Sequence, residues 1–232
     1  MFIGNVNISV FKTRLMSRNI SNSEFEIFNY WGDNNINPIF FKNGNKKFKE
    51  LTLKLDILCK DSDELEIMKS NLIKQLEIST IKFDDIDLYY SGFLTTAPTY
   101  SYVMKGNEIA EIKMLVIAEK LEKTETMNRI TSKTINVVGN LETPAIVEIT
   151  PATTLVDITL EGLADDPIII ENLTANKTVI LDGELQKITV DGVNKYGDTD
   201  MWDFPRLKPG ANTIKVDKNN CDIKIKYKPR YI

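Results

Sequence analysis

The sequence predicts a mainly β protein of the α+β class with two domains. A chain of 232 residues is long for one compact domain and comfortable for two. Residues 1–132 mix strand patterns with one helical pattern. Residues 133–232 contain short strand patterns separated by frequent Gly, Pro, Asn and Asp turn signals, which are typical of an all-β domain. We expect the polar run 119–132 to link the two domains, although its residues would also suit a solvated strand end or a short helix.

The first strong strand pattern is LTLKLDI at 51–57, where apolar and polar residues alternate. A period of two predicts a strand with one face on a core and the other toward water or a partner. A helix is expected directly after it. Asp61 is suited to cap this helix, and Glu64 stands at the spacing of a capping box. An apolar stripe at helical spacing predicts core packing, or alternatively a partner-helix surface, up to about Glu77; it consists of Leu65, Met68, Leu72, Ile73 and Leu76.

The remaining patterns are those of strands. Residues 81–94 predict a hairpin that turns at Asp84 and Asp85, and residues 109–117, rich in β-branched side chains, predict another strand. In the second domain we expect short strands at 145–149, 155–160, 168–171, 179–181, 187–190, 213–216 and 221–227. Strands with this spacing indicate a β-sandwich or a barrel.

Composition excludes several classes of function. The chain has no histidine, which removes Ser-His-Asp and Cys-His catalysis and His-ligated zinc. A net charge of −4 argues against a nucleic-acid binder that works through a basic surface. Cys59 and Cys221 are far apart at alternating apolar positions, so we expect two buried thiols without a disulfide or a metal. No signal peptide and no run that could span a bilayer is evident, so synthesis in the cytoplasm is expected.

Clustered carboxylates are the first candidates for chemistry. Asp residues gather at 61 and 63, at 84, 85 and 87, and at 198, 200 and 203. Each cluster sits at an expected turn or helix start, where Asp is favoured for local hydrogen bonding. A structural role is therefore the preferred interpretation, with a metal site or an acid/base pair as the alternatives. We expect no enzyme activity, no cofactor and no metal.

Aromatic residues in expected loops are the second candidates. Tyr196 and Trp202 are possible carbohydrate contacts, because an exposed ring can stack on the apolar face of a sugar. The competing interpretation is that Trp202 and Phe204 fill the core or pin the loop. Tyr30 and Trp31 are expected to serve packing or an intersubunit contact.

Segment 181–214 carries the most specific pattern in the chain. LDG at 181–183 and ITVDG at 188–192 are followed by WDFPRLKPGANTI at 202–214. This pattern resembles the C-terminal domain of phage distal tail proteins, the Dit family. Segments 139–151 and 83–92 also resemble that family, so the resemblance covers nearly the whole chain. The motif residues are expected to stabilise a loop that enters a strand and to form no active site; they are Phe204, Pro205, Leu207, Pro209, Gly210, Asn212 and Ile214.

The resemblance implies an assembly role. Residues 1–132 would be a ring-forming belt domain and residues 133–232 a galectin-like β-sandwich. A ring of copies of this chain, a homo-hexamer, would sit at the distal end of a long tail in the virion. It would join the tail tube to the tail-tip protein or tail-associated lysin, with the tape measure protein as a further partner, and the genome would pass through its channel without sequence-specific contacts. Assembly would take place in the host cytoplasm, without membrane insertion. The alternative is a carbohydrate-binding sandwich that helps attachment to the host surface.

Overall fold

The computed structural model describes residues 1–23, 29–30, 36, 39–40 and 48–232. The chain divides into two compact units, Met1–Glu119 with Ile232, and Lys120–Tyr231. The division falls at 119/120 and not at 132/133. The expected linker at 119–132 contains a strand, β11 (Lys123–Asn128), and every residue of β11 pairs with β22 (Cys221–Tyr227) of the second unit. Polar side chains suit β11 because the strand lies at the edge of its sheet.

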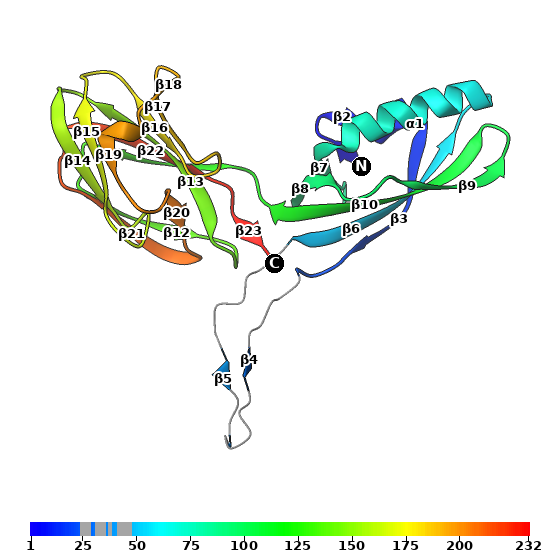
Figure 1. Ribbon diagram of the computed structural model, residues 1–232, viewed down its shortest axis with the longest axis horizontal. Helices are drawn as coiled ribbons and strands as arrows, with labels where there is room; N and C mark the ends of the chain where they lie inside the picture. Colours follow the sequence, from blue (N-terminus) through cyan, green and yellow to red (C-terminus); the bar gives the residue numbers. More distant parts are fainter. Residues whose placement is uncertain (24–28, 31–35, 37–38, 41–47) are drawn as a thin grey trace. The chain divides into compact units, whose positions relative to one another are not determined.

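The first unit is built on an antiparallel sheet with the strand order β2-β1-β7-β8-β10-β6-β3, and β9 also pairs with β10 (Figure 1). The hairpin expected at 81–94 and the strands expected at 51–57 and 109–117 are confirmed, with ends that differ by a few residues. A separate short pair joins β4 to β5. The bounds are β1 Phe2–Ile3, β2 Val6–Asn7, η1 Ile8–Phe11, β3 Thr13–Ile20, β4 Asn29–Tyr30, β5 Ile39–Phe40, β6 Lys49–Leu58, β7 Ile78–Lys82, β8 Tyr89–Leu94, β9 Thr99–Met104 and β10 Asn107–Glu119.

Helix α1 (Ser62–Leu76) lies along one face of this sheet (Figure 1). The Asp61 carboxylate accepts a hydrogen bond from the Glu64 N–H at 2.8 Å, and the Glu64 carboxylate accepts one from the Lys60 N–H at 3.0 Å. These bonds satisfy amide groups that a helix start leaves without partners. The expected apolar stripe faces the core, since Leu65 and Leu72 are buried together with the alternate residues of β6 and β10.

The second unit is a β-sandwich (Figure 1). One sheet has the order β11-β22-β13-β16-β17-β18, with β20 on β13, and the other has the order β12-β21-β14-β15-β19. Side chains from both sheets form one core, so the sandwich and not the barrel is the architecture, and the expected fold class is confirmed. The bounds are β12 Ser132–Val137, β13 Thr143–Pro151, β14 Leu155–Glu161, β15 Ile168–Leu173, β16 Val179–Asp182, β17 Lys187–Val190, β18 Val193–Asn194, η2 Tyr196–Asp198, β19 Thr199–Asp200, β20 Arg206–Leu207, β21 Gly210–Val216 and β23 Arg230–Tyr231.

Both cysteines are free and buried, as the sequence predicts. Burial raises the pKa of the Cys59 thiol and of the Cys221 thiol, which keeps both in the neutral form at neutral pH. Among the described residues, we find no helix with the length and apolar character needed to cross a bilayer.

Candidate functional site

Four of the motif residues lie in one loop of the second unit, residues 201–209, which we call the motif loop, and the other three lie in the strand that follows, β21. The motif loop leaves β19, which pairs with β15, and enters β21, which pairs with β12. Midway, Arg206 and Leu207 form β20 and pair with Pro144 and Thr143 of β13. The loop is therefore tied to both sheets of the sandwich.

Apolar motif residues anchor this loop to the core. Leu207 and Ile214 are fully buried, and Phe204 packs against the core cluster. The Phe204 ring also stacks on the ring of Tyr196, with centroids 6.2 Å apart. Gly210 has a φ of +92°, a left-handed conformation that strains residues with a side chain. These placements agree with a fold-stabilising role for the motif.

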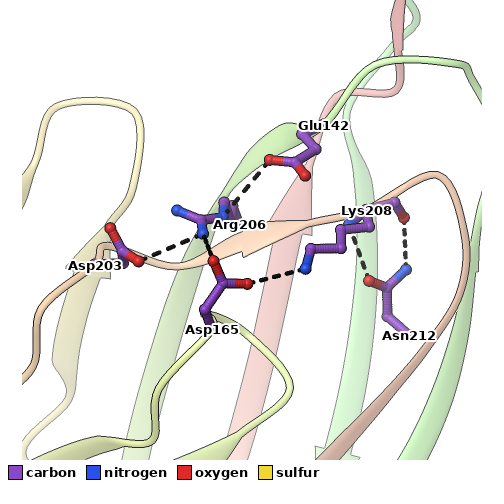
Figure 2. A network of polar contacts seen from close by, with 6 residues as sticks. All are labelled: Glu142, Asp165, Asp203, Arg206, Lys208 and Asn212. Carbon is purple, nitrogen blue, oxygen red and sulfur yellow. Dashed lines mark hydrogen bonds and ion pairs between the residues drawn. The ribbon is translucent and has the colours of Figure 1, made fainter. Parts of the chain in front are cut away.

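Asn212 holds the turn between the motif loop and β21 (Figure 2). Its side-chain oxygen accepts a hydrogen bond from the Lys208 N–H at 2.9 Å. Its side-chain nitrogen donates to the carbonyl oxygens of Lys208 at 2.7 Å and of Gly210 at 3.0 Å. One buried amide thus makes three hydrogen bonds to the backbone of the turn.

Arg206 gathers carboxylates from three separate segments of the chain (Figure 2). Its Nη2 donates to Asp165 Oδ2 at 2.6 Å and lies 3.4 Å from Asp203 Oδ2. Its Nε lies 3.6 Å from Glu142 Oε2. Lys208 Nζ donates to the second oxygen of Asp165 at 2.9 Å. A planar guanidinium with several fixed donors suits such a cluster better than an ammonium group would.

This network makes the stability of the second unit sensitive to acid. The hydrogen bond from Lys208, and then the charge of Arg206, lower the pKa of the Asp165 carboxyl. In the unfolded chain this carboxyl titrates near the ordinary value of about 3.9. Because the folded pKa is the lower one, the stabilisation is complete above the unfolded pKa and is lost as the pH falls through the folded pKa.

We expect Lys208→Met to raise the Asp165 pKa, measured by NMR titration of the carboxyl carbon. The exposed Lys215→Met is the control, and an unchanged Asp165 pKa in Lys208→Met would contradict the assignment.

A cleft of about 520 Å³ opens beside this network. Its walls come from the start of β13, the turn after β16 and the motif loop. The lining residues are Glu142, Thr143, Pro144, Gly183, Glu184, Gln186, Trp202, Asp203, Phe204, Pro205, Arg206 and Arg230. Most of them lie in segments with a visible sequence pattern, at 139–151, 181–183 and 202–214, but no pattern shows that these segments line one cleft, because they meet only in the folded sandwich.

The structure gives the two candidate carbohydrate contacts, Tyr196 and Trp202, different surroundings. Trp202 lines the cleft and is 86% exposed, so the interpretation that it fills the core is wrong. Tyr196 stacks on Phe204 and is not among the residues that line the cleft. Trp31 lies outside the described residues, as does the side chain of Tyr30.

The acidic clusters have structural partners. Asp61 caps α1, and Asp84 Oδ2 accepts a hydrogen bond from the Met1 amino group at 2.8 Å. Asp85 pairs with Arg18, and Asp198 pairs with Lys195 at 2.6 Å. Within the described part of the chain, no group of three or more Cys, Asp or Glu side chains is arranged to hold a metal ion.

Comparisons with known proteins point in the same direction as the motif. Residues 138–231 match the model of the siphovirus-type tail component, C-terminal domain. The fold is similar to the crystal structure of the phage SPP1 Dit protein, described as a paradigm of the hub adsorption apparatus in phages that infect Gram-positive bacteria. That match has a TM-score of 0.77 at 10% identity and covers 100% of this chain and 98% of the other.

Two baseplate structures of phage P2 in the activated conformation share the fold as well. The calcium-bound form gives a TM-score of 0.59 at 11% identity, covering 96% of this chain and 92% of the other. The strontium-bound form gives 0.58 at 11% identity, covering 97% and 94%. No curated protein matches the sequence. The second unit thus matches the model of the siphovirus-type tail component, and the whole chain shares its fold with a phage distal tail protein (Dit).

Proposed function

We propose that the chain is a structural hub of a phage tail tip, in which six copies close into a ring at the distal end of the tail. The observation that carries this proposal is the fold shared over both units with a Dit protein described as part of a hub adsorption apparatus. The first unit is the ring-forming belt, and the second is the peripheral galectin-like sandwich.

The outer face of the first unit's sheet supports a contact between copies. Cross-strand partners place Ile78, Phe93 and Leu115 in one row on the face opposite the buried residues of β10. Phe48 packs edge-on against Phe93, with ring centroids 5.6 Å apart, and Ile117 lies two residues beyond Leu115. We call these residues the sheet patch: Phe48, Ile78, Phe93, Leu115 and Ile117. Ile78 is 87% exposed in the single chain, which leaves apolar surface for burial against a second copy.

Charged pairs occupy the other half of the same face. Lys54 Nζ lies 3.7 Å from Glu111 Oε2, and Arg14 Nη2 lies 2.9 Å from Asp56 Oδ2. In such an interface, burial of the apolar patch gives affinity, and the charged area beside it fixes the orientation of the two copies. A ring needs a heterologous contact, in which this face meets a different surface of the next copy.

The partners follow from this position in the tail. One side of the ring would meet the tail tube, and the other the tail-tip protein or tail-associated lysin, with the tape measure protein as a further contact. Genomic DNA would pass through the channel, and the acidic chain suits a lining that does not retain a polyanion. Asp61 caps α1, and Asp84, Asp85 and Asp198 are held in ion pairs, which supports a role without enzyme activity.

Mass in solution tests the ring. Light scattering of the full chain should give six times the 26.4 kDa of one copy, and negative-stain images should show a sixfold ring with a central hole. We expect Ile78→Asp to shift the protein to monomers, because a buried carboxylate would face apolar surface. Val156→Asp is the matched control, since Val156 is 80% exposed in the second unit. A wild-type chain that stays monomeric at every concentration, or an Ile78→Asp ring, would contradict the assignment.

A further inference from the structure

We propose that the cleft in the second unit binds an uncharged saccharide, with Trp202 as the stacking platform. This goes beyond the hub role, and the two proposals stand or fall separately. The site consists of the Trp202 indole on one wall and the polar side chains of Glu142, Gln186, Asp203 and Arg206 around it.

Trp202 is the first reason. It is the most exposed of the aromatic side chains that the structure describes, at 86%, although an indole is usually covered in a folded domain. It lies directly beside a concave polar surface and not on an open apolar face. A flat π surface at the edge of a polar cleft matches a pyranose ring, which presents C–H groups on its face and hydroxyls around its rim.

The polar lining is the second reason. The Gln186 side chain is exposed and makes no hydrogen bond with any described residue, so its amide offers both a donor and an acceptor. Glu142 and Asp203 keep free oxygen lone pairs while they pair with Arg206. Each sugar hydroxyl both donates and accepts, which is the pattern that such a mixed set of planar groups can satisfy.

Charge balance favours a neutral ligand. Within the cleft, Arg206 lies among the carboxylates of Glu142 and Asp203, and Arg230 Nη2 lies 3.7 Å from Glu184 Oε1. The positive groups are therefore engaged by acidic neighbours, and a phosphate or carboxylate ligand would have to compete with them. A strongly cationic ligand would be repelled by the positive charges of Arg206 and Arg230.

The backbone that carries Trp202 is held in place before any ligand arrives. Two residues before Trp202, Asp200 pairs with Ile169 of β15, and four residues after it, Arg206 pairs with Pro144 of β13. Phe204 fixes the intervening backbone by its contact with the core. A pre-ordered site loses little conformational freedom on binding, which favours recognition of a small ligand.

A glycan array followed by calorimetric titration with the selected oligosaccharide tests the proposal on the full chain. We expect binding of at least one neutral oligosaccharide and a change in tryptophan fluorescence on titration. Trp202→Ala should weaken binding by at least about tenfold, whereas Trp202→Tyr should retain most of it. Gln186→Leu should weaken binding with no change in thermal stability.

Tyr102→Ala is the matched control for nonspecific adhesion, because Tyr102 is another exposed aromatic residue, in the first unit, at 74%. It should bind as the wild type does. The proposal would be overturned if no neutral glycan bound on the array or if only acidic glycans bound. Equal affinity of Trp202→Ala and the wild type would overturn it as well. None of these results bears on ring formation, which light scattering measures independently.

Discussion

Replacing Gly92 with alanine is expected to destabilise the first unit severely. Gly92 lies in β8, where it pairs with Ser79 of β7 on one side and with Val116 of β10 on the other. A Cβ at this position would stand 1.9 Å from the Leu115 carbonyl oxygen and 2.8 Å from the Val116 Cα. Both atoms belong to the backbone of β10, so the strands would have to separate in the middle of the sheet. Glycine in a strand interior often marks such a close approach.

We expect Gly92→Ala to cost about 3–5 kcal/mol of unfolding free energy, in the range of severe single substitutions. For a unit of this size the midpoint of thermal unfolding should fall by more than about 10 °C. Differential scanning calorimetry of the full chain measures this. The control is Gly197→Ala, because a Cβ at Gly197 meets nothing within 4 Å and should leave the midpoint unchanged. A Gly92→Ala midpoint equal to that of the wild type would show that β8 and β10 do not approach as described.

The same variant also bears on the proposed ring. Phe93 and Ile78 of the sheet patch lie on β8 and β7, directly beside Gly92 and its partner Ser79. Loss of the pairing between β8 and β10 would separate Phe93 from Leu115 and so disrupt the sheet patch. If the patch forms the contact between copies, Gly92→Ala should therefore lose the hexamer together with the structure of the first unit.

Asn212→Ala is the second substitution with a large expected effect. It removes three hydrogen bonds to the backbone of Lys208 and Gly210 in a nearly buried turn. Leaving buried groups without partners should cost about 3 kcal/mol, and the midpoint of the second unit should fall by about 10 °C. Asn212→Asp keeps the acceptor for the Lys208 N–H but points an oxygen at two carbonyl oxygens, so it should be destabilising as well.

Asn219→Ala is the matched control, because Asn219 is exposed and its side chain makes no hydrogen bond with the described residues. It should stay within about 0.5 kcal/mol of the wild type. Thermal unfolding followed by circular dichroism gives both values. An Asn212→Ala variant as stable as Asn219→Ala would mean that water replaces the amide and that the motif asparagine does not hold the turn.

Most of the regular elements could be predicted because their patterns are local. The alternation in β6 and in β22 and the stripe of α1 each lie within one element and report which face is buried. The cap at Asp61 was likewise visible, because N-caps use side chains within one helical turn. The short strands β18, β19 and β20 have only two residues each, too few for a period, and exist through their pairing with β17, β15 and β13.

The preferred interpretation of 119–132 as a linker was wrong for a related reason, and the alternative of a solvated strand is what the structure has. A polar run is typical of a connection, but β11 lies at a sheet edge, where polar residues are also favoured. The residues that decide between these two interpretations are in β22, about a hundred positions later in the chain. No pattern within the run itself contains that information.

The candidate site divides in the same way. The motif from Phe204 to Ile214 was visible in the sequence, because its prolines, glycine and asparagine restrict the backbone over a few neighbouring residues. The sequence by itself thus determined most of the longer strands, the helix, the motif turn and the resemblance of the second unit to the tail component. Only the tertiary structure decided that Trp202 is exposed beside a cleft, that Tyr196 stacks on Phe204, and that Arg206 meets Glu142 and Asp165. Local periodicity fixes which face of a strand is buried, whereas the exposure of a loop side chain depends on which distant segments pack beside it.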